Sequence, residues 1–214
     1  LEGPPPVFPV ILTRREDLSP DVVRFEFKAE DGGALPQFEA GGHIDVVIAP
    51  EYQRQYSLAG DPADRSRYVL GVQREVAGRG GSVLMTRVFR EGRRVFVSPP
   101  RNHFPLDEGA PFSLLMGGGI GITPMLTMAH RLHALGRDFA LHYSTRGAAP
   151  FWPEIAAAPW AGRARLHDSA AGHRADLQAL IPDWAPGHRL YACGGVAYMD
   201  AVFAAARAKG WPED

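Results

Sequence analysis

The chain has 214 residues, of which 45% are hydrophobic, and its 23 Lys and Arg residues nearly balance 24 Asp and Glu residues. Because the net charge is close to zero and no apolar run approaches the roughly 20 residues of a membrane span, nucleic acid and membranes are poor candidate partners, and a cytoplasmic protein is expected. The single Cys excludes a disulfide framework and any all-cysteine zinc or iron–sulfur site built from this chain alone.

The first half of the chain has the pattern of short strands. Apolar, often β-branched segments are separated by Gly, Pro and Asp, and residues 22–28 alternate apolar and polar side chains from Val23 onward. One helix, beginning near Ser82, interrupts them. This pattern predicts a six-stranded antiparallel β-barrel over residues 1–108. The expected strands are 7–12, 22–28, 43–49, 54–59, 68–74 and 93–97.

The second half alternates strands with helices. An apolar strand at 112–116 leads into three glycines and a helix, and three further strand–helix pairs follow. This alternation is typical of right-handed βαβ units and predicts an α/β domain with a parallel sheet over residues 109–214. The other expected strands are 139–143, 164–167 and 189–193, and the expected helices are 123–135, 152–158, 175–181 and 196–209.

The first chemically informative cluster is Arg54-Gln55-Tyr56-Ser57, in the fourth expected strand. Alternation along a strand places Arg54 and Tyr56 on one face and Gln55 and Ser57 on the other. An aromatic ring beside a cation and hydroxyl donors suits a planar, anionic cofactor, because Tyr can lie against a ring and Arg can bind phosphate as a fork. A barrel strand with a surface Arg and a partly buried Tyr is the alternative.

Glycines precede the expected helix of the first half, in the sequence Gly78-Arg79-Gly80-Gly81-Ser82. Such a loop lets backbone N–H groups approach a ligand, and Ser82 can cap the helix while the helix dipole faces an anion. The preceding residues 71–74 can offer backbone contacts to a bound ring, and Arg74 and Arg79 add positive charge nearby. An ordinary loop with an N-cap is the alternative.

The second half opens with Gly117-Gly118-Gly119-Ile120-Gly121-Ile122-Thr123-Pro124-Met125. This segment follows an apolar strand and begins a helix, which is the context of a dinucleotide-binding loop. Thr123 suits the N-cap of that helix, and Pro124 suits its first position. The spacing differs from the GxGxxG of many dehydrogenases, so the pattern predicts a different pyrophosphate loop. A tight turn without a ligand is the alternative.

The last expected strand ends at Cys193, which Gly194 and Gly195 follow. Because ligands of parallel sheets bind beyond the carboxyl ends of the strands, Cys193 is expected at the cleft. No neighbouring His suggests a nucleophile, so this Cys is interpreted as a packing or cofactor-lining residue. The eight His residues of the chain show no metal-ligand spacing, and no metal is expected.

Together and in this order, these motifs resemble the ferredoxin–NADP reductase superfamily over essentially the whole chain. The motif Arg54-x-Tyr56-Ser57 matches its flavin-binding barrel, and residues 117–125 and 193–195 match its nucleotide-binding domain. The chain is most similar to the FMN-type reductases of the phthalate dioxygenase reductase and vanillate demethylase reductase group, a module that is also fused to haem monooxygenases. FAD-binding members usually carry a further Ser where this chain has Gly60, and this departure favours FMN.

The resemblance implies an FMN-binding barrel domain over residues 1–108 and an NAD(P)H-binding domain over residues 109–214. Hydride would pass from cofactor to cofactor, so no catalytic side chain is expected. Contacts with FMN are implied for Arg54, Gln55, Tyr56, Ser57, Val72, Gln73 and Arg74, with its phosphate for Gly80, Gly81 and Ser82, and from the second domain for Thr123. Contacts with the dinucleotide are implied for Gly118, Gly119, Ile120, Gly121, Pro124, Cys193 and Gly194.

Ser144 and Arg146 follow the second expected parallel strand, at the place where an acidic residue would bind the ribose hydroxyls of NADH. Ser and Arg at that place can bind a 2′-phosphate. NADPH is therefore favoured over NADH as the hydride donor. A solvated loop arginine is the alternative.

The two ends of the chain differ from the resembling group. The chain begins at Leu1 rather than Met and stops at 210–214, where members of the group continue into one more strand and a plant-type ferredoxin domain with a 2Fe-2S cluster. We therefore expect a monomeric module cut from something longer, with that ferredoxin domain and an oxygenase as partners, fused or separate. A stand-alone flavin or ferric reductase, an FAD-containing reductase and a non-catalytic nucleotide-binding module are the alternatives.

Overall fold

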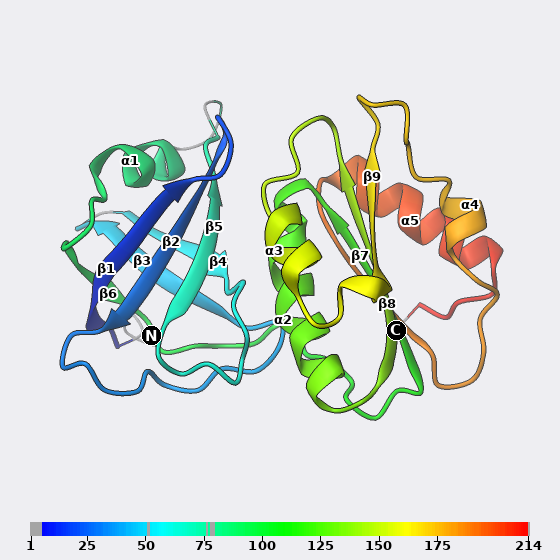
Figure 1. The fold of residues 1–214 in the computed structure, drawn as a ribbon, viewed down its shortest axis with the longest axis horizontal. Coiled ribbons are helices and arrows are strands. Elements are labelled where there is room, and N and C mark those ends of the chain that lie inside the picture. Colours follow the sequence, from blue (N-terminus) through cyan, green and yellow to red (C-terminus); the bar gives the residue numbers. More distant parts are fainter. Residues whose placement is uncertain (1–5, 51, 76, 78–79, 214) are drawn as a thin grey trace, which may run out of the picture. The chain divides into compact units, whose positions relative to one another are not determined.

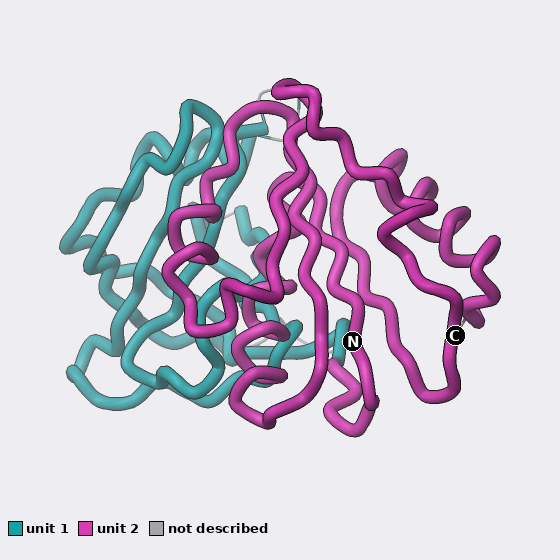
Figure 2. Tube along the Cα trace, turned by 45° about the vertical axis from the view of Figure 1, so that its right-hand side comes forward, with its two compact units in different colours: residues 1–105 teal, residues 106–214 magenta. Residues whose placement is uncertain are grey.

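The computed structural model describes residues 6–50, 52–75, 77 and 80–213. The chain divides into two compact units, Leu1–Pro105 and Leu106–Asp214, each built on its own sheet (Figure 2). In the part of the chain that is described, no helix is long and apolar enough to cross a membrane.

Unit 1 is an antiparallel barrel (Figure 1). An isolated bridge between Leu58 and Leu70 joins the segment just after the fourth strand to the fifth and closes the sheet. One helix, α1 (Gly81–Val88), packs against β3, β4 and β5. The strands lie in the order β4-β3-β6-β1-β2-β5 and are β1 (Phe8–Asp17), β2 (Val22–Ala29), β3 (His43–Ala49), β4 (Tyr52–Ser57), β5 (Tyr68–Gln73) and β6 (Arg94–Val97).

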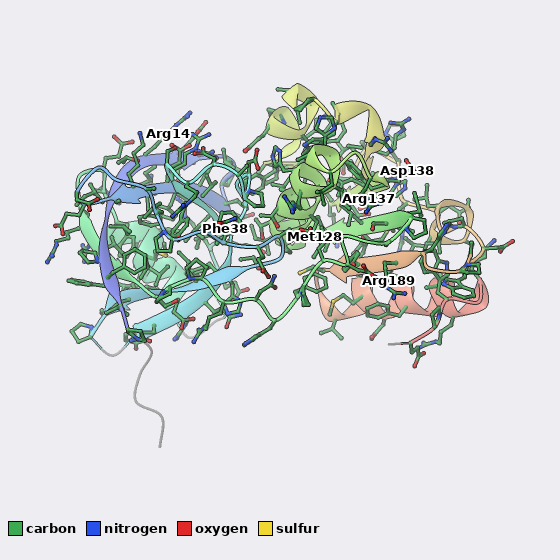
Figure 3. The ribbon with its side chains drawn as sticks, turned by 90° about the horizontal axis from the view of Figure 1, so that it is seen from below. Arg14, Phe38, Met128, Arg137, Asp138 and Arg189 are labelled. Atoms are coloured by element: carbon green, nitrogen blue, oxygen red, sulfur yellow. The ribbon has the colours of Figure 1, made fainter. Side chains whose placement is uncertain are left out.

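Alternate strand residues fill the barrel interior. Along β3, the side chains of Ile44, Val46 and Ile48 are buried, while the residues between them are partly exposed. Phe38, labelled in Figure 3, packs edge-on against the ring of Tyr68, with 6.0 Å between ring centroids. Because each fully buried large apolar side chain contributes roughly 1.5–3 kcal/mol, this core fixes β4 and its neighbours firmly.

Unit 2 is a parallel sheet between two helical layers. The strands β7 (Phe112–Gly118), β8 (Asp138–Thr145), β9 (Ala164–Asp168) and β10 (Arg189–Cys193) lie in the order β10-β7-β8-β9. The chain thus moves outward from β7 to β9 and then returns to the other side of β7. Ligands of open α/β sheets bind beyond the carboxyl ends of the strands at such a reversal, here between β7 and β10.

The helices of unit 2 follow from this path. The first two helices lie on one face of the sheet and the last two on the other (Figure 1). Leu114 and Met116 of β7 form a core with Val202 and Ala206 on the second face, and Met128, labelled in Figure 3, is fully buried. The helices are α2 (Ile122–Ala134), α3 (Trp152–Ala157), α4 (Leu177–Leu180) and α5 (Val196–Ala208), with short 3₁₀ turns η1 (Gly119–Gly121) and η2 (Ala161–Arg163).

The structure confirms the predicted fold class, a six-stranded antiparallel barrel with a parallel α/β unit. The strands at 43–49 and 189–193 have the predicted bounds. The first strand was predicted too short: β1 continues through a charged segment to Asp17, because Arg14 and the residues after it pair with β2 beyond a bulge. The helix predicted at 175–181 is shorter, Leu177–Leu180.

Candidate cofactor-binding sites

The candidate anion site of unit 1 lies where β4 meets the start of α1. A Cβ added to Gly81 would lie 2.8 Å from Nε and 3.0 Å from Cγ of Arg54, so the arginine stem occupies the space that a side chain there would need. Gly80, the N-cap, has φ of 80°, and no side chain caps the helix. A guanidinium thus lies beside the uncapped N–H groups of a helix N-terminus, an arrangement that fits a phosphate.

Ser82 is not the helix cap that the sequence predicted. Its Oγ accepts a hydrogen bond from the N–H of Glu75 at 3.0 Å, and α1 begins one residue earlier. The hydroxyl therefore ties the segment after β5 to the helix. The predicted loop residues Gly78 and Arg79 lie outside the described residues.

Tyr56 is half-buried on the core side of β4. Its Cα pairs with that of Ile44, and its ring packs against the barrel core. Burial raises the pKa of its phenol to about 12, with Arg54 opposing and Glu75 adding to the shift. The ring is therefore a neutral, partly covered flat surface beside Arg54. Gln55 is exposed, as the predicted alternation requires, whereas Ser57, predicted on the same face, is partly buried like Tyr56.

The other side chains predicted to line the flavin point in different directions. Val72 is fully buried in the barrel core, and Gln73 is exposed. The Arg74 guanidinium donates to Asp17 Oδ1 at 2.6 Å and to the Pro20 carbonyl. Arg74 is thus held at the β1–β2 turn, where it helps Arg15 to lower the pKa of Asp17.

The glycine loop of unit 2 is packed backbone against backbone. A Cβ on Gly121 would lie 2.2 Å from the carbonyl oxygen of Cys193 and 2.6 Å from the N atom of Gly194. Gly119 has φ of 55°, the left-handed region that favours glycine. The turn between β7 and α2 therefore lies directly against the carboxyl end of β10. Its glycines carry no side chains that would keep an anion such as a pyrophosphate from the backbone.

The predicted capping of α2 is wrong. The helix begins at Ile122 after the η1 turn, Gly121 is its N-cap, and no side chain caps it. Gly121 already has helical φ and ψ, because the 3₁₀ turn runs directly into the helix. Thr123 is buried, and its hydroxyl donates to the carbonyl of Ile120 at 3.1 Å, while Pro124 is also buried.

The end of β10 meets the end of β7 at two glycines. A Cβ on Gly194 would lie 2.8 Å from the ring of Tyr198 and 3.1 Å from the carbonyl oxygen of Gly118. Cys193 is partly buried, and burial raises the pKa of its thiol. A protonated thiol fits the packing or lining role that the sequence suggested for this residue.

The end of β8 carries Ser144, whose Cα pairs with Gly118 on one side and His167 on the other. The structure therefore brings Ser144 to the same edge as the glycine loop. Its hydroxyl oxygen is buried. Arg146 is exposed in the loop that follows.

Sequence reasoning missed Asp168, which organises that loop. Its Oδ1 accepts hydrogen bonds from the N–H of Gly147 at 2.7 Å and of Ala170 at 2.9 Å. The hydrogen bond from Gly147 is the main cause of a lowered pKa for this carboxyl. The only signal for this role in the sequence was an acidic residue directly after the expected strand 164–167.

A pair of histidines on β8 and β9 was also missed. Nδ1 of His142 lies 2.9 Å from Nε2 of His167, and the rings stack. Burial, followed by the charges of His167 and Arg165, lowers the pKa of His142 to about 4. The described residues hold no group of three His, Cys, Asp or Glu that could bind a metal ion.

Comparison with known proteins shows consistent similarity over both units. Vanillate O-demethylase oxidoreductase of Pseudomonas sp. (strain HR199 / DSM 7063) is 40% identical over 209 residues, which cover 96% of this chain and 66% of that protein. Phthalate dioxygenase reductase of Burkholderia cepacia is 39% identical over 196 residues, covering 89% of this chain and 61% of that protein. No protein-family model matches the chain.

Solved structures of known proteins are also similar to this chain. Phthalate dioxygenase reductase, described as a modular structure for electron transfer from pyridine nucleotides to [2Fe-2S], has a TM-score of 0.89 at 37% identity, with 97% of this chain and 65% of that chain covered. The full-length CYP116B46 of Tepidiphilus thermophilus has a TM-score of 0.89 at 38% identity, with 95% and 27% covered.

The similarity extends along nearly the whole of this chain. The chain spans only 57% to 66% of the length of three curated relatives that are 40% to 42% identical to it. The barrel and the parallel sheet match the fold that the sequence resemblance implies. The chain belongs to the ferredoxin–NADP reductase superfamily, in the group of phthalate dioxygenase reductase and vanillate O-demethylase oxidoreductase.

Proposed function

We propose that the chain is a reductase module that takes hydride from NADPH onto FMN and passes electrons singly to an iron–sulfur domain that supplies an oxygenase. One observation carries the proposal: each unit has a glycine turn at the start of a helix that is shaped for an anion. Arg54 packs against Gly81 in unit 1, and Gly121 packs against Cys193 in unit 2.

The barrel residues fit a flavin mononucleotide. Arg54 and the backbone at Gly80 and Gly81 would hold its phosphate, and the neutral ring of Tyr56 would lie against its ring system. Gly60 favours FMN over FAD on a structural ground as well. A Cβ there would lie 3.3 Å from Cγ2 of Val69, so the additional Ser of FAD-binding members would be crowded.

The parallel sheet fits a dinucleotide. The backbone of residues 118–124 would hold the pyrophosphate, and Cys193 and Gly194 would flank the nicotinamide. Ser144 and Arg146, at the end of β8, would lie near the ribose that carries the 2′-phosphate of NADPH. Arg74, held by Asp17, would stay outside the flavin contacts or would first have to leave that carboxylate.

Bound FMN would supply a ring that accepts hydride and releases its two electrons one at a time. The residues of the chain would contribute binding, alignment and exclusion of water rather than proton transfer. A role without proton transfer fits these residues, because the thiol of Cys193 and the phenol of Tyr56 both keep their protons at neutral pH. A monomeric state and a cytoplasmic location belong to the same proposal.

The names of the relatives support an oxygenase system as the destination of the electrons. Phthalate dioxygenase reductase is by name the reductase of an oxygenase, and vanillate O-demethylase oxidoreductase is by name the oxidoreductase of a demethylase. The structure of the latter is described as transferring electrons from pyridine nucleotides to [2Fe-2S]. We propose a plant-type ferredoxin domain and an oxygenase, fused or separate, as the partners of this chain.

The flavin assignment is tested by reconstitution. The chain, stripped of any flavin, is titrated with FMN and with FAD, and the flavin that copurifies is released and identified by chromatography. We expect FMN to bind at least about 10-fold more tightly than FAD, which corresponds to roughly 1.4 kcal/mol. Tighter FAD binding would make the chain an FAD-containing reductase, and no binding of either flavin would refute the proposal.

A further inference from the structure

Tyr198, the third residue of α5, lies across the ends of two strands. A Cβ on Gly118, the last residue of β7, would lie 2.7 Å from Cδ1 of its ring, and a Cβ on Gly194 would lie 2.8 Å from the same atom. The ring thus rests directly on the backbone of both glycines. Neither position accepts a side chain without moving the ring or the strand.

The hydroxyl of the same side chain lies beside a third strand end. Ser144, at the end of β8, is close enough to lower the pKa of the Tyr198 phenol, although burial raises that pKa overall to about 12. Both hydroxyl oxygens are buried, and no hydrogen bond of normal geometry satisfies either one. The phenol keeps its proton at neutral pH, so its O–H group can donate one hydrogen bond.

A purely structural role does not explain this hydroxyl. A buried polar group without a partner costs free energy that a Phe of the same shape would not. Tyr198 also lies against Gly118 of β7, Ser144 of β8 and Gly194, the residue directly after β10, and each of them belongs to the proposed nucleotide site. Ring and hydroxyl therefore act on different parts of that site.

We infer that Tyr198 is a positioning residue of the nucleotide site, whose ring sets the spacing between Gly118 and Gly194 and whose hydroxyl orients Ser144. This inference rests on the proposed function. The ring would affect the pyrophosphate and nicotinamide end of a bound dinucleotide, because those glycines border that end. The hydroxyl would affect the ribose-phosphate end, through the direction in which Ser144 donates its own proton.

The inference is tested on the full chain loaded with FMN, with the variant Tyr198→Phe. Dissociation constants of NADP⁺ and NAD⁺ are measured by isothermal titration calorimetry, which does not depend on turnover. Without the hydroxyl that orients Ser144, the hydrogen bond that Ser144 would donate to the bound 2′-phosphate should be lost, which is expected to weaken NADP⁺ binding about 5- to 10-fold and NAD⁺ binding less than about 2-fold. The ratio kcat/KM for NADPH over that for NADH should fall by the same factor.

A second variant addresses the ring. Tyr198→Leu keeps an apolar side chain but leaves the two glycines unsupported, so binding of both nucleotides should weaken, and the rate of flavin reduction at saturating NADPH should fall about 10-fold or more. Melting temperature and FMN affinity are measured on the same samples. Because Tyr198 makes no contribution to unit 1 in this account, FMN affinity should stay at the wild-type value.

Tyr143→Phe is the matched control. Tyr143 is also a buried tyrosine of unit 2, one residue before Ser144, and its buried hydroxyl, like that of Tyr198, has no hydrogen bond of normal geometry. Removal of this hydroxyl should leave the NADP⁺ to NAD⁺ affinity ratio unchanged. Equal weakening of both nucleotides in Tyr198→Phe, or no change in either, would overturn the inference. Failure of the wild-type chain to bind either nucleotide would refute the proposed function instead.

Discussion

The candidate anion sites of the two units are built from different chemical groups. In unit 1, a charged side chain, Arg54, packs against a glycine at a helix start. In unit 2, Gly121 packs against the backbone of Cys193, and the ring of Tyr198 lies on the backbone of Gly118 and Gly194. A long side chain can move when a neighbour changes, whereas a backbone fixed in a sheet cannot. We therefore expect graded effects in unit 1 and severe ones in unit 2.

The largest expected effect is that of Gly121→Ala. Its Cβ would lie 2.2 Å from a backbone oxygen that is part of β10, so the strand end or the loop has to move. We expect a loss of at least about 3 kcal/mol in unfolding free energy and about 100-fold in NADP⁺ affinity. All four Trp residues lie in unit 2, so Trp fluorescence during denaturation reports on that unit.

Gly195→Ala is the control for this substitution. A Cβ on Gly195 would meet no atom within 4 Å, and its φ of −62° suits any residue. Its unfolding free energy should stay within about 0.5 kcal/mol of the wild-type value. Equal effects of the two substitutions would show that close backbone packing does not set the sensitivity of unit 2.

The second effect is a loss of stability of unit 2 in acid, which His142 is expected to cause. Because burial lowers its pKa to about 4 in the folded chain, against about 6.5 unfolded, its contribution to stability is complete above pH 6.5 and is lost as the pH falls toward 4. The loss is at most about 3 kcal/mol. Trp fluorescence during urea unfolding at pH 7 and pH 4.5 measures it, and His142→Gln should reduce the difference.

This acid effect sharpens the comparison, because unit 1 also contains a buried histidine. Burial, with Arg101 and His103, lowers the pKa of His43 as well. A probe of unit 1, such as the fluorescence of bound FMN, should therefore show a separate acid transition. If His142→Gln leaves the acid sensitivity of the Trp signal unchanged, the buried His142–His167 pair is not its source.

The third effect is the graded response of unit 1. Arg54→Gln removes a charged donor and should weaken FMN binding about 10- to 100-fold, in keeping with roughly 1.5–3 kcal/mol for a hydrogen bond to a charged group. Gly81→Ala leaves the arginine present but displaced, and should weaken binding about 10-fold. Both are measured by FMN fluorescence titration.

Arg94→Gln is the control for the unit 1 variants. Arg94 is an exposed arginine of β6 that pairs with Glu30. Its replacement should leave FMN affinity at the wild-type value. A loss in Arg94→Gln as large as that in Arg54→Gln would mean that general positive charge, and not the contact with Gly81, determines binding.

The smallest effect is expected at the surface of unit 2. Arg131 and Glu108 form an exposed pair, with Nε and Oε1 2.6 Å apart, and Arg131 lowers the pKa of Glu108. Exposed pairs contribute little, so Arg131→Gln should change the unfolding free energy by less than about 1 kcal/mol. A larger change, measured by Trp fluorescence, would show that surface charge rather than packing at the strand ends stabilises unit 2.

Much of the fold could be predicted because the local patterns agree with the tertiary structure. The short β-branched segment His43–Ala49 and the apolar run before Gly117 each indicate the correct strand. The alternation at 22–28 also indicates a strand, but all of residues 22–27 are buried there rather than half-buried. The charged end of β1 could not be predicted, because Arg15 is held there by Asp17, Glu91 and the Thr86 carbonyl. These partners are distant in sequence except for Asp17.

The candidate sites were predictable where the chemistry is local. The glycine turns and Arg54 stand out in the sequence. The predicted caps at Ser82 and Thr123 were wrong, because each helix begins directly from a glycine and the hydroxyls bind other backbone groups. Tyr198 gave no signal, since its contact with Gly118 joins residues 80 positions apart in the chain.

The most direct test of the account is an anaerobic titration of the FMN-loaded chain with NADPH, followed by the visible absorbance of the flavin. The account predicts that one equivalent of NADPH bleaches the flavin and that Gly121→Ala prevents this while FMN stays bound. If the wild-type chain binds both FMN and NADPH but its flavin stays oxidised, the proposed hydride transfer between the two sites is contradicted.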